Sequence, residues 1–186
     1  MISAYIGNLG KYHEGILAVE PLRLPATTEE VQAVLSRIGV DGVWYEEIHI
    51  VDYETDVAGL RARLGENENI DELNYLASLL EEMDSGEMKK FEAAVALGEY
   101  AGSVKDLINL TQNLDCYEFY SDVKTEEDLG QYLIDEAGAL DVPKHIRDYF
   151  DYEAYGRDMF LNSTSDFTDS GYIENNQSSF IVHYDG

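Results

Sequence analysis

The chain has 186 residues, of which 38 are acidic and 12 are basic, giving a net charge of −26. A charge of this size repels nucleic acid and anionic membranes, so we expect neither as a partner. The single cysteine, Cys116, excludes an internal disulfide, and no apolar run approaches the roughly 20 residues that a membrane helix needs. The first residues lack the pattern of a signal peptide. We therefore expect a cytoplasmic protein with a hydrophobic core.

The first third of the chain is predicted to mix strands and a helix. Ile2–Ile6 and Ile16–Leu24 are typical of strands, and Pro21 places the second one at a sheet edge or at a bulge. Thr27–Glu30 matches a capping box that opens a helix, which Gly39 closes. The aromatic and β-branched run that follows predicts another strand, Val43–Tyr53.

The middle of the chain is predicted to be helical. One apolar stripe at helical spacing begins at Ile70 and ends at Met83. A second stripe runs from Met88 to Val95, after a break at Ser85-Gly86. We expect two or three short helices here.

The last third is predicted to return to mixed structure. Ser103–Asp106 and Thr125–Asp128 match helix N-terminal caps, and Cys116–Tyr120 is typical of a strand. Pro143 suits the first position of a further helix. We expect a polar loop from Asn162 to Ser178, and a final strand is predicted over Ser179–Tyr184.

These changes of character predict an α+β fold with three small domains. We expect an N-terminal α+β domain over 1–61, a small helical domain over 62–102 and a C-terminal α+β domain over 103–186. No internal repeat is present.

Motifs of metal, cofactor and nucleotide chemistry are missing from the sequence. The four histidines have no metal-ligand spacing, and neither a glycine-rich phosphate loop nor a calcium loop occurs. We therefore expect no metal, no cofactor and no enzymatic activity. A carboxylate-based hydrolase stays open as an alternative, and it would depend on one or two acids with a raised pKa.

The acidic residues are spread along the whole chain. Residues 1–60 carry 10 acidic and 3 basic residues, residues 61–102 carry 10 and 4, and residues 103–186 carry 18 and 5. No run of five like charges marks a solvated tail, so we expect the acids on the surfaces of folded elements. Fixed carboxylates can imitate DNA phosphates, and 26 charges would match about 44 Å of duplex. Asp148 and Asp151 have the three-residue spacing of neighbours on a helix.

Seventeen carboxylates are our candidates for this partner-binding, DNA-mimicking surface. They are Glu46, Glu47, Asp52, Glu54, Asp71, Glu72, Glu81, Glu82, Glu126, Glu127, Asp128, Asp135, Glu136, Asp148, Asp151, Glu153 and Asp158. Any one of them, taken alone, is more typical of a solvated surface residue, so the hypothesis rests on the whole set.

The segment Tyr149–Met159, YFDYEAYGRDM, alternates aromatic and acidic residues. We hypothesise that its aromatic residues, namely Tyr149, Phe150, Tyr152 and Tyr155, anchor the segment to a core or a subunit interface. The acids would then be held outward. Gly156 would allow a turn after the helix, and Arg157 would pair with an acid.

Four separated motifs resemble those of the ArdA antirestriction proteins. YIGNLGKYHEG at Tyr5–Gly15 is similar to the family's YIANLGKYNEG, with Gly7 for Ala and His13 for Asn. IVDYE at Ile50–Glu54, and IDELNYLASLLEEM at Ile70–Met83, also resemble family motifs. YFDYEAYGRD at Tyr149–Asp158 differs from the family pattern at one position, where Phe stands for Ile.

The resemblance implies an inhibitor of type I restriction-modification enzymes, carried by conjugative elements. Proteins of this family are elongated homodimers of three-domain chains, which mimic bent DNA and occupy the enzyme's DNA-binding groove. The methyltransferase core and the specificity subunit would be the partner. The family's antirestriction motif, near the dimer interface, would map to Tyr132, Asp135, Glu136, Gly138, Asp141 and Pro143. An acidic module for another basic partner, such as a histone-like protein, is the alternative.

Overall fold

The computed structural model describes residues 1–186 and shows a mixed α+β chain with two small antiparallel sheets. The chain forms two compact units. Unit 1 comprises residues 1–88, 100–112 and 182–186, and unit 2 comprises residues 89–99 and 113–181. The division into three domains stays a prediction. None of the helices has the length and apolar character needed to cross a membrane.

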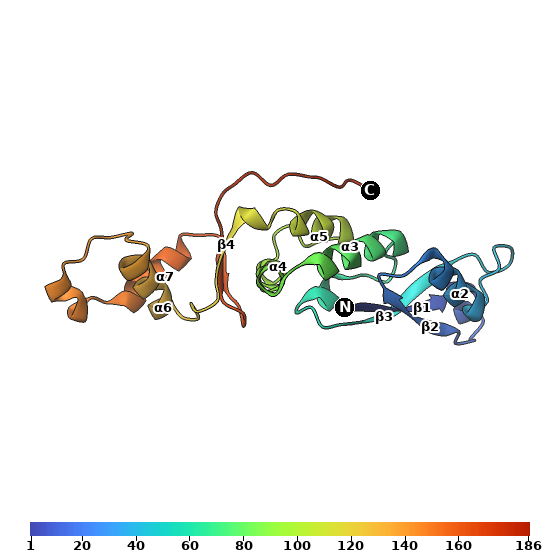
Figure 1. The fold of residues 1–186 in the computed structure, drawn as a ribbon. Coiled ribbons are helices and arrows are strands. Elements are labelled where there is room, and N and C mark those ends of the chain that lie inside the picture. The colour runs from blue at the N-terminus through green and yellow to red at the C-terminus, as the bar shows by residue number, and fades with distance from the viewer. The chain divides into compact units, whose positions relative to one another are not determined.

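Unit 1 is built on a three-stranded antiparallel sheet in the order β2-β1-β3 (Figure 1). Its strands are β1 (Ile2–Asn8), β2 (Val19–Leu24) and β3 (Ile48–Thr55). The alternating residues of β1 bury Ile2, Ala4 and Ile6 in the core. Of the two positions predicted for Pro21, a sheet edge or a bulge, the edge is confirmed, because β2 pairs only with β1.

Local sequence signals set the helices beside this sheet. The capping box of Thr27 and Glu30 opens α2 (Thr28–Ile38), and Gly39 ends it with a left-handed φ of 80°. Asn8 caps α1 (Leu9–His13), since its side chain accepts a hydrogen bond from the Lys11 N–H in the first turn of that helix.

The predicted helical middle is also observed. It contains a short 3-10 helix, η1 (Leu60–Arg63), followed by α3 (Ile70–Glu82), α4 (Ser85–Leu97) and α5 (Val104–Thr111). Ser103 caps α5 as predicted, through a hydrogen bond from the Asp106 N–H. Leu73, Leu76 and Leu107 are fully buried where α3 packs against α5.

Unit 2 holds the second sheet, in the order β4-β6-β5, and the remaining helices (Figure 1). The strands are β4 (Tyr117–Tyr120), β5 (Ser165–Phe167) and β6 (Tyr172–Asn175). The helices are the 3-10 helix η2 (Leu114–Cys116), α6 (Glu126–Gln131), the π-helical turn η3 (Tyr132–Glu136), the 3-10 helix η4 (Lys144–Tyr149) and α7 (Tyr152–Leu161).

Three predictions about local structure were wrong. Residues 43–47 form a loop, and the strand predicted there begins at Ile48. The segment expected to be a polar loop contains β5 and β6, because Tyr172 and Ile173 bury their side chains in unit 2. Ser179–Tyr184 is extended but joins neither sheet.

Two buried asparagine side chains hold this extended C-terminal segment. In unit 1, the Asn109 carboxamide accepts hydrogen bonds from the backbone N–H groups of His183 and Tyr184 and donates one to the Tyr184 carbonyl. In unit 2, the Asn113 carboxamide accepts a hydrogen bond from the Ile181 N–H and donates one to the Ile181 carbonyl. The side chains thus replace a neighbouring strand, which explains why the segment is extended without being part of a sheet.

Candidate functional site

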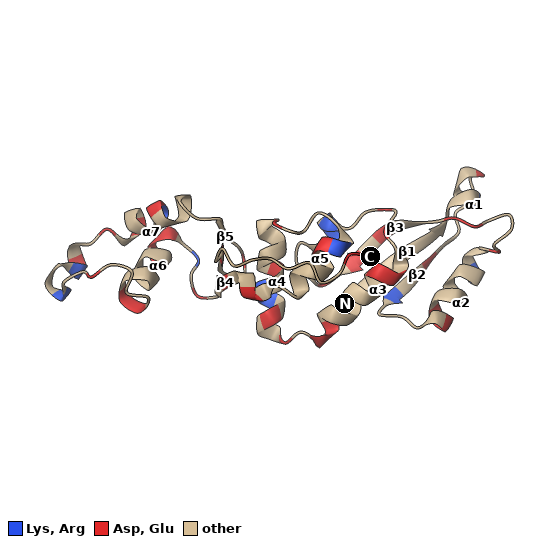
Figure 2. Cartoon of the chain, turned by 90° about the horizontal axis from the view of Figure 1, so that it is seen from above, with Lys and Arg blue, Asp and Glu red and all other residues tan.

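All seventeen candidate carboxylates reach solvent. Fourteen of them are exposed, and Glu72, Glu126 and Asp128 are partly buried. The acids are shared between the two units, since unit 1 carries 20 acidic and 6 basic residues and unit 2 carries 18 and 6 (Figure 2). The net negative charge is therefore divided almost equally between the two units.

On the sheet of unit 1, Asp52 and Glu54 project from β3. The Asp52 carboxylate accepts hydrogen bonds from its neighbour, the Tyr53 N–H, and from Arg61 at 2.6 Å. These bonds hold the pKa of Asp52 below its usual range. Glu54 accepts a hydrogen bond from the Tyr5 hydroxyl at 3.3 Å. Asp52 is thus partly neutralised by its own chain.

Helix α3 carries acids at both ends. Asp71 and Glu72 lie in its first turn, where the helix dipole stabilises anions. Glu81 and Glu82 lie in its last turn, which has no basic residue, and there the dipole disfavours them. Glu81 and Glu82 therefore work against the stability of α3.

In unit 2, α6 opens with three acids, Glu126, Glu127 and Asp128. Asp128 closes a capping box with Thr125, which was the predicted cap. Two hydrogen bonds hold the pKa of Asp128 below its usual range. The larger effect comes from the Lys124 backbone N–H, and the smaller one comes from the Thr125 side chain. This carboxylate is fixed in position by the start of its helix.

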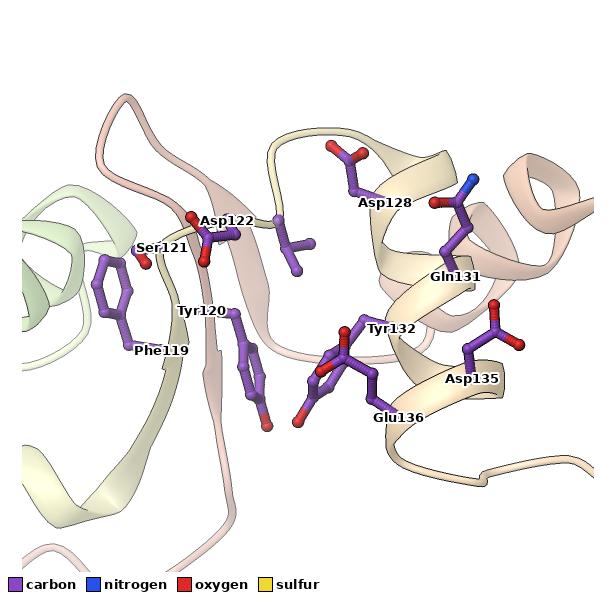
Figure 3. Close-up of a pocket in the computed structure, with 10 residues that line it drawn as sticks. Phe119, Tyr120, Ser121, Asp122, Asp128, Gln131, Tyr132, Asp135 and Glu136 are labelled. Atoms are coloured by element: carbon purple, nitrogen blue, oxygen red, sulfur yellow. The ribbon is translucent and has the colours of Figure 1, made fainter.

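A pocket of about 470 Å³ brings several candidate residues together (Figure 3). Asp128, Tyr132, Asp135 and Glu136 line it, all of them from α6 and η3. Tyr132 packs on Tyr120 with 4.4 Å between the ring centroids. Burial, together with hydrogen bonding to Tyr132, raises the pKa of Tyr120.

Sequence reasoning missed one acid of this pocket, Asp122. It follows β4 in a turn and carries no motif, so only the fold brings it into the same pocket as the candidates of η3. The pocket is thus lined by aromatic rings and by more carboxylates than were predicted.

The helix expected after Pro143 is broken in two. Pro143 precedes η4, and α7 starts only at Tyr152, with Asp151 as its N-cap. The Asp151 carboxylate accepts a hydrogen bond from the Ala154 N–H at 2.9 Å. Asp148 and Asp151 therefore do not share a helix face, and the spacing argument for this pair was wrong.

The aromatic residues of Tyr149–Met159 divide into two kinds. Phe150 is half-buried and packs edge-on against Tyr152 and Tyr155, with centroids at 5.1 and 5.8 Å. Tyr149 is 88% exposed, so it anchors no core of this chain. The expected ion pair of Arg157 is confirmed, with Glu126 as its partner at 3.9 Å.

We had expected Gly156 to end its helix, and this prediction was wrong. Gly156 lies buried in the middle of α7. A β-carbon at Gly156 would lie 1.8 Å from the Glu126 carbonyl oxygen of α6. The glycine therefore permits close helix packing.

The residues of the mapped antirestriction motif lie in and after η3. Asp135 forms an ion pair with Arg147, which also donates a hydrogen bond to the Val142 carbonyl. Gly138 has a left-handed φ of 65°, which suits glycine where the helical segment ends. Asp141 and Pro143 are exposed. Arg147 thus closes the loop that carries the motif.

Only four of the seventeen candidates form ion pairs within the chain. They are Asp52, Glu72, Glu126 and Asp135, which pair with Arg61, Lys105, Arg157 and Arg147. Surface ion pairs of this kind are weak. Most of the candidate charge is therefore free to meet cations of another molecule.

A folded chain with exposed, largely unpaired carboxylates on both units is suited to binding a basic partner. Residues 4–174 match the family model described as antirestriction protein (ArdA). The chain therefore belongs to the ArdA family, and this membership implies an antirestriction function. The search of curated proteins found no match.

Proposed function

We propose that this protein inhibits type I restriction-modification enzymes by presenting its carboxylates in place of DNA phosphates. It would occupy the DNA-binding groove of the methyltransferase core and specificity subunit, and so protect an incoming conjugative element in the cytoplasm. The observation that carries the proposal is the exposure of fourteen of the seventeen candidate carboxylates. Family membership supports a restriction enzyme as the target.

We further propose that the chain acts by binding and not by catalysis. A hydrolytic acid needs a raised pKa in a cleft. The six carboxyl groups with a shifted pKa, which are Glu30, Asp41, Asp52, Asp56, Asp84 and Asp128, are all shifted downward. Two of them, Asp52 and Asp128, are among the candidate carboxylates, and their lowered pKa favours the charged form.

A homodimer through unit 2 is part of the proposal. Leu140, Ile146 and Tyr149 are exposed apolar side chains on one short segment of this unit. Exposed apolar groups close together are typical of protein interfaces. Changing Ile146 to Asp should shift the protein from dimer to monomer in light scattering, and an unchanged mass would exclude this surface.

A competition titration tests the inhibitory function. A type I methyltransferase core is bound to labelled cognate DNA, and the protein is added at several salt concentrations. We expect displacement at near-stoichiometric protein, weakening as salt rises, because screening reduces the attraction between carboxylates and a basic groove. Failure to displace DNA from several such enzymes would contradict the proposal. Displacement of DNA from histone-like proteins instead would favour the other basic partner.

A further inference from the structure

The protein's only tryptophan, Trp44, belongs to unit 1 and is 85% exposed. It lies in the loop between α2 and β3, which extends beyond the end of the sheet (Figure 2). Its neighbour Val43 is 73% exposed. Large aromatic side chains contribute most to stability when they are buried, so the fold of the free chain gains little from this indole.

The loop is nevertheless built to hold Trp44 in this position. One Asp41 carboxylate oxygen accepts hydrogen bonds from three successive backbone N–H groups, those of Val43, Trp44 and Tyr45, at 2.8 to 3.0 Å. The Tyr45 carbonyl in turn accepts the N–H groups of Asp41 and Gly42. The backbone on both sides of the indole is thereby fixed.

Tyr45 fastens the loop to the rest of unit 1. Its hydroxyl donates a hydrogen bond to the Glu14 carboxylate at 2.8 Å, and its ring lies against Gly10, where a β-carbon would be 2.7 Å from the ring. The Lys11 ammonium lies 5.6 Å from the ring centroid. Tyr45 is therefore turned inward while Trp44, one residue earlier, is turned outward.

Acidic residues flank Trp44 in the sequence on both sides. Asp41 precedes it, and Glu46 and Glu47 follow it, both exposed and among the candidate acids. A second copy of this chain, or an anionic membrane, would bring more negative charge against them. Charge complementarity instead favours a surface that carries basic side chains around an apolar or aromatic contact.

We propose that Trp44 is an aromatic anchor that docks into the basic DNA-binding groove of the restriction enzyme. This inference rests on the proposed function and names a contact that is not electrostatic. A rigid, preorganised tryptophan has the properties of an interface hot spot, because little side-chain entropy is lost when it is buried. The carboxylates would supply attraction and orientation, and the indole would supply affinity that salt does not screen.

The first test is the same DNA competition with Trp44→Ala. We expect about 30-fold more protein to be needed for displacement, as for a typical hot-spot tryptophan, with the salt dependence unchanged because no charge is lost. Trp44→Phe should recover part of the loss. Leu161→Ala, which removes an apolar side chain of α7 that is 71% exposed, is the control and should match the wild type.

A second test reads the contact directly. Trp44 labelled as 5-fluorotryptophan gives a single fluorine resonance, and an unlabelled enzyme adds no background. We expect the resonance to shift and broaden in the complex and to lose its sensitivity to a soluble paramagnetic reagent. This readout does not depend on whether a substituted loop keeps its structure.

The outcomes separate the two proposals. If the wild type displaces DNA but Trp44→Ala does so equally well, or if the resonance stays solvent-exposed in the complex, the anchor is rejected and the inhibitory function stands. If the wild type displaces no DNA, both proposals are rejected. A lighter oligomer for Trp44→Ala, without weaker displacement, would assign the indole to self-association and reject the anchor.

Discussion

Gly130 on α6 and Gly156 on α7 bring their two helices into backbone contact. A β-carbon at Gly130 would lie 2.0 Å from the Tyr152 carbonyl oxygen, and one at Gly156 would lie 2.8 Å from the Gly130 nitrogen. Both residues are buried. The acids at the start of α6 and those of α7 are therefore carried by one closely packed helix pair.

We predict that Gly156→Ala destabilises this helix pair by about 3 kcal/mol, because a backbone obstacle cannot rotate away as a side chain can. Hydrogen exchange should accelerate in peptides covering α6 and α7. Gly102→Ala is the control, since its β-carbon would meet only the Asp106 carboxylate, at an ordinary 3.4 Å. Equal exchange in both variants would show that the helices can separate without cost.

Asn109→Ala should release the C-terminal end of the chain. Asn109 is buried, and its loss leaves the backbone groups of His183 and Tyr184 without their partner, at a cost of about 2 kcal/mol. Amide exchange of His183 and Tyr184, followed by NMR, should rise sharply. Gln112→Ala, an exposed neighbour, should leave it unchanged. Slow exchange in Asn109→Ala would mean that other contacts hold the segment.

The loop that carries Trp44 should respond to acid through Asp41. Hydrogen bonds from the N–H groups of Tyr45, Val43 and Trp44 lower the pKa of Asp41 from its ordinary value of 3.8. A lowered folded-state pKa means that the stabilisation is complete above pH 3.8 and is lost as pH falls through the lower value. Trp44 fluorescence anisotropy should therefore decrease in that range.

The variant Asp41→Asn should show no such decrease, because an amide does not titrate. Glu30→Gln, which removes another low-pKa carboxyl at α2, should leave the Trp44 titration as in the wild type. Dilute protein is needed because the isoelectric point, about 4.1, lies close to this range. A decrease that persists in Asp41→Asn would assign the transition to another group.

Neutralising three exposed acids of unit 2 should weaken DNA displacement about tenfold at low salt. The variant combines Asp148→Asn, Glu153→Gln and Asp158→Asn, none of which forms an ion pair or a helix cap. Surface charge contacts contribute about 0.5 kcal/mol each, and screening should erase the difference at high salt.

The matched control keeps every charge while changing each side-chain length, through Asp148→Glu, Glu153→Asp and Asp158→Glu. It should displace DNA nearly as well as the wild type. Equal weakening in both triple variants would mean that side-chain shape matters here and not charge.

Structural features that depend on residues close together in the sequence, such as helix caps, could be predicted from the sequence. Thr27, Ser103 and Thr125 begin helices as predicted, because a cap and the N–H group that it accepts are three residues apart. The break between η4 and α7 was missed, since an alternation of aromatic and acidic residues suits one helix as well as two.

Contacts between distant residues were not readable. Asn109 looked like an ordinary polar residue of α5, and its partners lie about 75 residues away. Asp41 and Tyr45 convert a run with strong strand character into a loop, which hydrophobicity and β-propensity do not reveal. Gly156 looked like a helix end, because a single sequence cannot show which backbone lies against a glycine.

Asp128, which closes the capping box of α6, and Asp151, the N-cap of α7, have a consequence for mutational surveys. Asp128 and Asp151 each carry a negative charge and also complete a helix start. An alanine at either position removes both, so an alanine scan would overrate the charge at these two sites. Asparagine retains the cap and removes only the charge. Comparing the two substitutions at each site would separate the cost of fraying a helix from the cost of losing an electrostatic contact.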